Sequence, residues 1–263
     1  MIKYIKGDIF SSPAQVLVNT VNLDGVTGKG IALQFKKLYP DMYEKYQKYC
    51  EDNLLDIGKL WIYKSETKWI LNFPTKIHWR NPSKLEYVEK GLQKFVDTYK
   101  EKGITSVAFP KLGCGNGGLD WEIVKPLMDN YLKNLPIDIY VYEDKFQTEK
   151  EFENIKEIKK WLSQHPKDLS YIEFKNDIKL IAQDKEINID SIDDILFSNF
   201  WSILKNTGFI SKNNEYKLLF ELSSHLEYVI PCQIRNGLHG IMTDSLQLRL
   251  SSEDSICQTQ MII

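Results

Sequence analysis

Two glycine-rich segments carry the residues whose types and spacing best suit the binding of an anion. Residues 25–30 hold three glycines and follow the apolar run 16–18, whereas residues 113–118 hold four glycines and follow Pro110. Glycine has no Cβ atom, so successive backbone N–H groups can approach a bound group and converge on it. Two such loops in one small domain predict a site for a diphosphate.

Neither loop matches a standard nucleotide-binding motif. A P-loop needs Gly-Lys-Ser/Thr at a set spacing, and a dinucleotide fold needs an acidic residue about twenty positions after its glycines. Neither pattern is present. For each loop taken alone, a tight turn between a strand and a helix remains the alternative.

Residues 1–148 alternate between short apolar runs and amphipathic segments, which predicts an α/β domain. The expected strands are 2–5, 16–18, 60–64, 69–73, 106–109 and 137–142, and the expected helices are 30–38, 40–51, 84–101 and 121–135. The third helix has an apolar face, and Ser83 is expected as its N-cap with Glu86 as the capping-box partner. These elements would place both glycine loops between a strand and a helix.

Residues 149–263 show a different pattern, which indicates a second domain. A charged helix is expected at 148–164, a core helix at 192–204 that ends near Gly208, and a helix or hairpin at 215–229. The pattern beyond Pro231 predicts no particular element. We therefore expect two domains, residues 1–148 and residues 149–263.

Composition is that of an ordinary globular protein, with 43% hydrophobic and 27% charged residues. No apolar run approaches the roughly 20 residues that cross a bilayer, and no signal peptide is evident, so a cytoplasmic protein without membrane contact is expected. Residues 1–148 hold 21 basic and 18 acidic side chains, and residues 149–263 hold 13 and 18. This asymmetry permits a polyanionic substrate for residues 1–148 and a basic partner for residues 149–263.

The four cysteines are far apart and form no metal-binding pattern; they are Cys50, Cys114, Cys232 and Cys257. Reduced thiols are expected, and neither a metal nor a cofactor is indicated. Cys114 lies within the second glycine loop. We interpret it as a small side chain that fits there, not as a nucleophile.

Five segments resemble the motifs of macro domains: residues 7–9, 19–22, 28–35, 72–80 and 112–121. The segment 72–80 is similar, more narrowly, to the DarG branch, the DNA ADP-ribosyl glycohydrolases that act as antitoxins against the toxin DarT. The resemblance covers about residues 1–145. It implies a three-layer α/β/α macrodomain with a mixed central sheet, followed by a smaller, mainly helical C-terminal domain, for which a winged helix is one arrangement.

The resemblance implies an enzyme that hydrolyses the bond between ADP-ribose and thymine in single-stranded DNA, and so reverses the modification made by a DarT-like toxin. It also implies that the C-terminal domain binds that toxin. Two alternatives stay open. One is a module that binds ADP-ribose or another NAD-derived signal without hydrolysis, and the other is a hydrolase that acts on protein-linked or O-acetyl-ADP-ribose.

An ADP-ribose site is implied along the loops and strand ends. Asp8 would accept a hydrogen bond from the adenine amino group, or else be a solvated turn residue, and Tyr142 would lie near the adenine, or else pack in the core. The loops and the helix N-termini after them would hold the diphosphate. The residues expected to bind ADP-ribose are Asp8, Ile9, Thr20, Asn22, Gly28, Lys29, Gly30, Ile31, Gly113, Cys114, Gly115, Asn116, Gly117, Gly118, Leu119 and Tyr142.

Asn22 and Lys76 are the catalytic residues that the resemblance implies. Asn22 would bond the hydroxyls of the distal ribose, with an Asx turn as the alternative. Lys76 would act as an acid or base, or attack the opened sugar, if desolvation lowers its pKa; a solvated lysine is the alternative. Trp79 and Arg80 would contact DNA by stacking on a base and pairing with a phosphate, with a structural role as the alternative.

Overall fold

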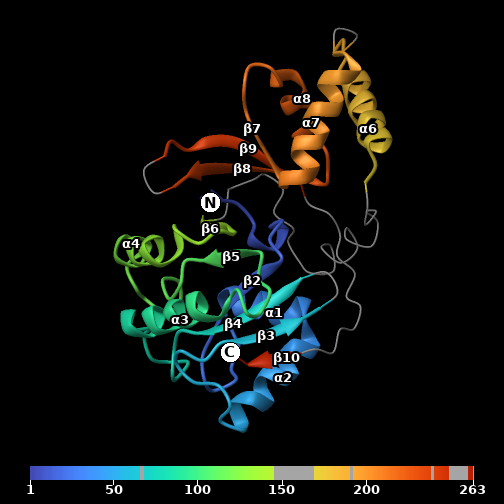
Figure 1. Cartoon of the computed structure of the whole chain (residues 1–263). Coiled ribbons are helices and arrows are strands. Elements are labelled where there is room, and N and C mark those ends of the chain that lie inside the picture. Colours follow the sequence, from blue (N-terminus) through green and yellow to red (C-terminus); the bar gives the residue numbers. More distant parts are fainter. Residues whose placement is uncertain (66–67, 145–168, 190–191, 238–239, 249–259, 263) are drawn as a thin grey trace.

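The computed structural model describes residues 1–65, 68–144, 169–189, 192–237, 240–248 and 260–262. In this part of the chain ten strands form one continuous sheet, in the order β10-β3-β4-β2-β5-β6-β1-β8-β9-β7 (Figure 1). The strands are β1 (Ile2–Lys6), β2 (Val16–Val21), β3 (Trp61–Lys64), β4 (Trp69–Pro74), β5 (Ser106–Pro110), β6 (Asp138–Asp144), β7 (Phe209–Ser211), β8 (Val229–Asn236), β9 (Thr243–Leu248) and β10 (Gln260–Ile262).

The first six strands form the mixed sheet that the resemblance implies. Strands β4, β2, β5, β6 and β1 are parallel, whereas β3 is antiparallel to β4. The carboxyl ends of the parallel strands therefore meet along one edge of the sheet. In open α/β sheets this edge is where ligands bind.

Helices cover both faces of this sheet, so the predicted three-layer α/β/α fold is confirmed (Figure 1). α1 (Gly30–Leu38) and α2 (Pro40–Glu51) bury Phe35, Met42 and Tyr46 in the core on one face. α3 (Leu85–Thr98) and α4 (Trp121–Leu132) bury side chains in the core on the other face. The apolar stripe of each helix faces the sheet, as the spacing predicts.

The predicted cap of α3 is wrong. Lys84 holds the N-cap position and makes no side-chain capping bond. Ser83 is buried and turns instead toward the second glycine loop, where its N–H donates to Gly117 O at 2.9 Å. The backbone bond to Gly117 holds Ser83 against the glycine loop, and α3 begins one residue later than the sequence predicts.

The C-terminal region contains α6 (Tyr171–Asp184), α7 (Asp194–Thr207) and α8 (Lys217–Ser223). Their apolar faces pack with residues of β7, β8 and β9 into a third core. The core helix expected at 192–204 corresponds to α7, which ends at Gly208 with a φ of 74°, the left-handed conformation that glycine allows. The helix expected at 148–164 and Cys257 lie outside the described residues.

The C-terminal strands join the sheet of the N-terminal region directly. β8 pairs antiparallel with β1, and β9 and β7 follow at the outer edge of the sheet. Phe209, Cys232 and Ile234 belong to the same core cluster as Tyr140 and Tyr142 of β6. Within the described residues, the two regions thus share a sheet and a core, whereas the expected boundary at residue 148 lies outside them.

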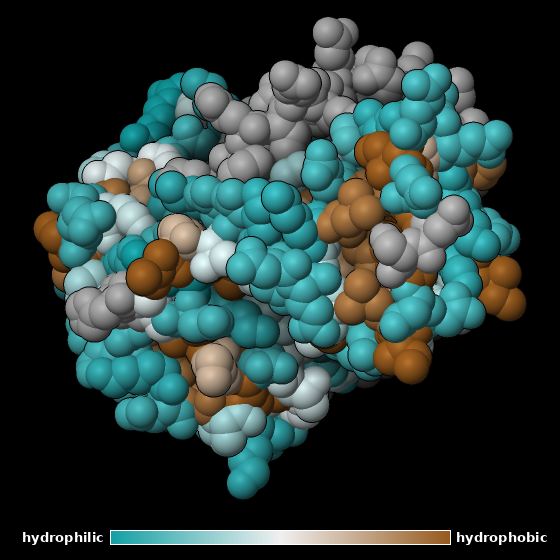
Figure 2. Space-filling model, turned by 90° about the horizontal axis from the view of Figure 1, so that it is seen from above, coloured by the Kyte–Doolittle hydropathy of each residue, from teal (hydrophilic) through white to brown (hydrophobic). Residues whose placement is uncertain are grey.

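The surface above the C-terminal helices is mostly hydrophilic, with hydrophobic residues gathered toward one side (Figure 2). Exposed apolar side chains include Ile172 and Leu180 of α6 and Ile195 and Ile203 of α7. Each pair is eight residues apart, so its members lie on one side of their helix. None of the helices in the described residues has the length and apolarity needed to cross a membrane.

Candidate active site

A cavity of about 810 Å³ lies at the carboxyl ends of the parallel strands. Such a volume suits a ligand of nucleotide size. Its walls come from the ends of β1, β2, β4, β5 and β6, from the first turn of α1 and from both glycine loops. The sequence-predicted residues that line it are Asp8, Ile9, Thr20, Asn22, Gly28, Lys29, Gly30, Ile31, Lys76, Trp79, Arg80, Gly113, Gly115, Asn116, Gly117 and Tyr142.

Three residues expected at the site do not line the cavity. Cys114 and Leu119 pack against the core beneath the second loop, and Gly118 is exposed. Burial raises the pKa of the Cys114 thiol to about 11. A thiol with this pKa is protonated near neutral pH, which agrees with its interpretation as a small packing residue.

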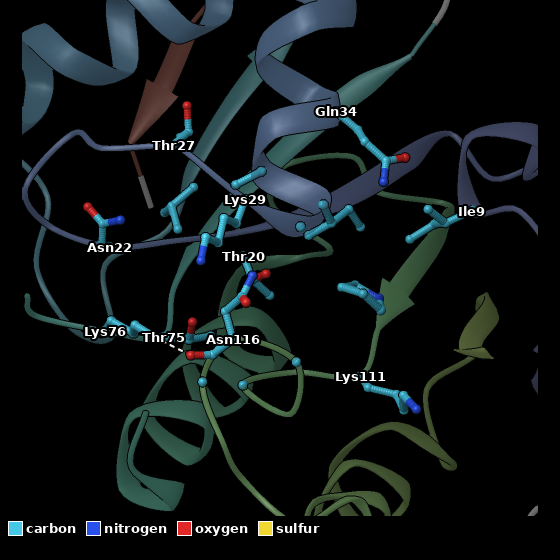
Figure 3. A pocket seen from close by; sticks show the side chains of 18 of the residues that line it. Ile9, Thr20, Asn22, Thr27, Lys29, Gln34, Thr75, Lys76, Lys111 and Asn116 are labelled. Carbon is cyan, nitrogen blue, oxygen red and sulfur yellow. Dashed lines mark hydrogen bonds between the residues drawn. The ribbon is translucent and has the colours of Figure 1, made fainter. Parts of the chain in front are cut away.

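The cavity is elongated (Figure 3). Ile9 and Gln34 lie at one end, Asn22 and Lys76 lie at the other, and Lys29 and Asn116 face each other between them. One end, called the apolar end below, thus combines Ile9 with the polar Gln34, and the other end carries Asn22 and Lys76. A ligand with an aromatic group, a charged middle and a polar tail matches this order.

At the apolar end, Asp8 follows β1 and caps the short 3-10 helix η1 (Ile9–Ser11). Its carboxylate accepts hydrogen bonds from Phe10 N at 3.1 Å and from Ser11 Oγ at 3.1 Å. Asp8 is half-buried and lines the cavity while it serves this turn. The turn interpretation fits these two contacts, and a carboxylate can accept more than two hydrogen bonds.

The first glycine loop leads directly into α1. Lys29 is the N-cap and makes no side-chain capping bond, and residues of the first turn of this helix line the cavity. Gly30 has a φ of 63°, and a Cβ atom there would lie 2.7 Å from Nδ2 of Asn116. The N-terminus of α1 is thus suited to a phosphate group.

The second loop depends on close packing rather than on a helix. A Cβ atom on Gly117 would lie 2.1 Å from Gly113 O and 2.4 Å from Ser83 Oγ, so only glycine fits there. The helix that follows, α4, is capped by Asp120, which accepts a bond from Glu122 N at 3.0 Å. The first turn of α4 does not line the cavity. The expected help of this helix in anion binding has no counterpart in the cavity wall, since the Asp120 carboxylate caps its N-terminus.

Asn22 is buried and forms an Asx turn. Its Oδ1 accepts from Asp24 N at 3.0 Å, and its Nδ2 donates to Val26 O at 2.6 Å. Tyr46 of α2 donates its hydroxyl to Asn22 O at 2.8 Å. These bonds fix the first loop, and the side chain also lines the cavity.

Lys76 follows β4 and reaches across the cavity to the second loop. Its Nζ donates to Asn116 O at 2.5 Å and approaches Trp79 O at 3.5 Å (Figure 3). Burial lowers the pKa of this half-buried amine below that of an ordinary lysine. Lower pKa means that the neutral, reactive amine appears at a lower pH.

Trp79 lies at the rim and is 44% exposed. The backbone N–H of Trp79 donates to Asp24 Oδ2 at 2.7 Å, and this bond connects the segment 75–81 to the start of the first glycine loop. The indole stacks on His78 at 6.1 Å between ring centroids, and the Arg80 guanidinium lies 4.6 Å from the indole centroid. An aromatic ring and a cation thus stand together at the mouth of the cavity.

The cavity also contains residues that the sequence did not single out. They include Phe10, Thr27, Gln34, Thr75, Lys111 and Glu143. Several had a usable signal: Gln34 lies one helical turn after Gly30 and Ile31, Thr75 precedes Lys76, and Glu143 follows Tyr142. In the described part of the chain, no group of three His, Cys, Asp or Glu side chains is placed to hold a metal ion.

Comparison with known proteins identifies the fold. Residues 18–128 match the Macro domain family. The chain is 45% identical over 148 residues to a DNA ADP-ribosyl glycohydrolase of Thermus aquaticus, a match that covers 54% of this chain and 41% of that protein. It is 41% identical over 160 residues to a DNA ADP-ribosyl transferase-DNA ADP-ribosyl glycohydrolase fusion protein of Thermosipho africanus, again covering 54% and 41%.

Solved structures agree. The macrodomain of Thermus aquaticus DarG matches with a TM-score of 0.52 at 44% identity, covering 54% of this chain and 98% of that one. Thermosipho africanus DarTG in complex with ADP-ribose matches with a TM-score of 0.53 at 41% identity, covering 57% and 43%. The chain belongs to the macro domain family, as its motifs predicted. It spans less than half the length of the two curated relatives, and the family match ends at residue 128.

Proposed function

We propose that the chain is a DNA ADP-ribosyl glycohydrolase that removes ADP-ribose from thymine in single-stranded DNA. The observation that carries this proposal is the placement of Lys76, an amine with a lowered pKa, beside Asn22 at one end of a cavity of nucleotide size. Relatives named DNA ADP-ribosyl glycohydrolase at 45% identity support it.

The bound ADP-ribose would follow the length of the cavity. Adenine would lie between Asp8 and Tyr142, where apolar walls and an acceptor meet. The diphosphate would lie against the N-terminus of α1 and the amides of residues 113–118, because both offer N–H groups to an anion. The distal ribose would then reach Asn22, and its anomeric carbon would face Lys76.

Lys76 would carry the chemistry at that carbon. Hydrolysis breaks the bond between the anomeric carbon and thymine, water supplies the new hydroxyl, and a thymine nitrogen receives a proton. The amine would donate or accept that proton, or form an imine with the opened sugar before water releases it. A ligand that displaces the contact with Asn116 O would free the amine for either role.

Trp79 and Arg80 would hold the DNA outside the cavity. An exposed indole can stack on an unpaired base of any identity, and an arginine can pair with a phosphate. Their place at the rim near Lys76 supports contacts on the thymine side of the scissile bond.

The direct test measures release of ADP-ribose from a thymine-ADP-ribosylated single-stranded oligonucleotide by the full chain. We expect the chain to release ADP-ribose from this oligonucleotide. The control is the same oligonucleotide after its modification has been removed enzymatically, and it should release none. A matched assay uses protein-linked and O-acetyl-ADP-ribose. If only protein-linked or O-acetyl-ADP-ribose is turned over, the proposed DNA substrate is wrong and one of these two is the substrate.

A second candidate is a module that binds ADP-ribose without hydrolysis. The observation that favours it is the bond from Lys76 Nζ to Asn116 O, by which the lysine acts as a strut between two loops. Such a module would bind ADP-ribose in calorimetry yet release none from any conjugate. Activity lost in Lys76→Ala, with binding retained, would exclude it.

We also propose that the C-terminal region binds a DarT-like toxin. The fusion of a transferase with a glycohydrolase in the Thermosipho africanus relative supports a physical association of the two activities. The exposed acidic residues Asp184 and Glu186, at the end of α6, would contribute charge attraction. Capture of the toxin by the full chain should weaken with salt and with Asp184→Lys, and retention unaffected by either would argue against this role for the acidic segment.

A further inference from the structure

A glutamine from the C-terminal region contacts the apolar end of the cavity. Gln247 of β9 has no exposed surface, and its Nε2 donates to the hydroxyl of Tyr142 at 3.0 Å. Tyr142 lies in β6, is buried, and lines the cavity. Gln247 therefore lies directly behind one wall of the ligand site.

The environment of Gln247 gives no packing reason for a polar side chain. Its neighbours Leu246 and Leu248 are buried on the opposite face of β9 in the C-terminal core. The Oε1 atom of Gln247 is buried and has no hydrogen-bond partner among the described residues. Burying an amide with one unmet acceptor costs free energy, so packing alone does not account for a glutamine at this position.

The unmet oxygen lies against a second part of the cavity wall. A Cβ atom on Gly7 would stand 3.2 Å from Gln247 Oε1 and 3.2 Å from Cβ of Cys232. Gly7 lines the cavity and precedes Asp8. One amide thus bonds Tyr142 and lies beside Gly7, and both of these residues line the cavity.

A neighbouring contact shows the same arrangement. Arg235 of β8 donates to Glu143 Oε1 at 3.0 Å, and Glu143 also receives bonds from Trp121 at 3.2 Å and Lys125 at 2.5 Å. Glu143 follows Tyr142 in β6 and lines the cavity. β8 and β9 therefore hold two successive residues at the end of β6.

We propose that Gln247 is a positioning residue for the adenine end of the site and acts through the hydroxyl of Tyr142. This inference rests on the proposed binding of ADP-ribose with its adenine at Asp8 and Tyr142. A ring fixed at its hydroxyl as well as at its backbone is already in place before the ligand arrives. Less conformational entropy is then lost on binding, which raises affinity.

Calorimetry with ADP-ribose on the full chain tests this role. Gln247→Met keeps length and volume but removes the donor, and Tyr142→Phe removes the group it binds. Each variant should bind ADP-ribose with an affinity roughly two- to tenfold lower than that of the wild type. Tyr142→Phe also removes the bond between the hydroxyl and Ser12. The double variant should therefore bind ADP-ribose no more weakly than Tyr142→Phe alone, because Gln247 acts only through the hydroxyl that this change removes.

Gln233→Met is the matched control. Gln233 lies on β8 and donates to Asp244 at 2.9 Å on the surface, away from Tyr142. The affinity of the Gln233→Met variant for ADP-ribose should equal that of the wild type. A general weakening of the sheet would affect all three variants, whereas coupling between Gln247 and Tyr142 would not appear in Gln233→Met.

Two results would overturn the inference while the proposed function stands: unchanged affinity in folded Gln247→Met, or losses that add in the double variant. If Gln247→Met does not fold, unchanged affinity in Tyr142→Phe overturns it instead, because the hydroxyl is the route of action. A wild-type chain that binds no ADP-ribose would overturn the proposed function, and this inference with it.

Discussion

The two ends of the cavity are built differently. At the Asn22 end the walls are loops, held by hydrogen bonds such as those from Asn22 Nδ2 to Val26 O and from Lys76 Nζ to Asn116 O. At the Tyr142 end the walls are strand ends, held from the C-terminal region by Gln247 and Arg235. These last contacts join residues that are 105 and 92 positions apart in the sequence.

This difference suggests that the loop end of the cavity adjusts during the reaction and that the strand end recognises the ligand. A loop held by a few polar bonds can rearrange when a ligand supplies competing groups, whereas a strand end inside a ten-stranded sheet cannot. Chemistry that needs an amine to leave one partner and reach another suits the loop end. Binding that needs a fixed surface suits the strand end, so substitutions at the two ends should affect different measured quantities.

The largest effect is expected for Lys76→Ala. Turnover of thymine-linked ADP-ribose should fall on the order of 10²–10⁴-fold, because the amine acts mainly in the transition state. Affinity for ADP-ribose should stay within a few-fold of the wild type. Single-turnover rates at saturating enzyme, with calorimetry beside them, measure both.

Lys84→Ala is the control for Lys76→Ala, since Lys84 is exposed nearby and does not line the cavity. A pH series adds a second check. Burial lowers the Lys76 pKa, so if the neutral amine reacts, the rate should rise with pH and level off below the ordinary lysine value of about 10.4. Equal rates in wild type and Lys76→Ala would remove the lysine from the chemistry.

The second loop should be sensitive at one glycine and tolerant at another. Gly117→Ala places a methyl group against Gly113 O and Ser83 Oγ, so it should lower the free energy of unfolding by roughly 1–3 kcal/mol and weaken ADP-ribose. Gly115→Ala meets no atom within 4 Å and should unfold like the wild type. Denaturant titration of both variants decides this, and equal losses would mean that close packing does not define the loop.

Local signals in the sequence predicted many of the residues that line the loop end of the cavity. The starts of α1, α2, β2 and β4 follow from short apolar runs and from the glycines and prolines beside them, whereas β2 continues to Val21, three residues past its expected end. Gly28 to Ile31, Asn22, Lys76 and Asn116 came from motifs in which neighbouring residues act together, so one sequence window contained the needed information. The same locality explains the error at Ser83, whose partner Gly117 lies far along the chain.

The strand end could not be predicted in this way. Nothing between Pro231 and Leu248 indicates that β8 pairs with β1, because the pairing depends on an edge formed by residues 2–6. The register brings Arg235 opposite Tyr4, and only this register explains why Arg235 reaches Glu143. Contacts of this kind arise from the folded sheet and have no counterpart in local spacing.

Asp8 tests the strand end. Asp8→Ala should weaken the binding of ADP-ribose by about 1–3 kcal/mol, because the variant lacks the carboxylate that would accept a hydrogen bond from the adenine amino group. It should also lower stability, since the residue caps η1. Asp8→Asn separates the two effects, because asparagine caps equally well but lacks the charge. Full affinity in a folded Asp8→Ala would place the adenine elsewhere.

The smallest effect is expected at the rim, outside both ends of the cavity. Trp79 is 44% exposed and contacts His78 and Arg80 rather than the cavity interior alone. If its indole stacks on one unpaired base, Trp79→Ala should raise the KM for modified oligonucleotide roughly fivefold, which corresponds to about 1 kcal/mol, the lower limit for such stacking. Affinity for free ADP-ribose should not change, because free ADP-ribose has no base beyond the scissile bond. Trp79→Phe should recover part of the loss, since a smaller ring still stacks. Equal KM values for wild type and Trp79→Ala would show that the rim does not hold the strand, whereas a loss that extends to free ADP-ribose would place Trp79 among the loops that shape the Asn22 end.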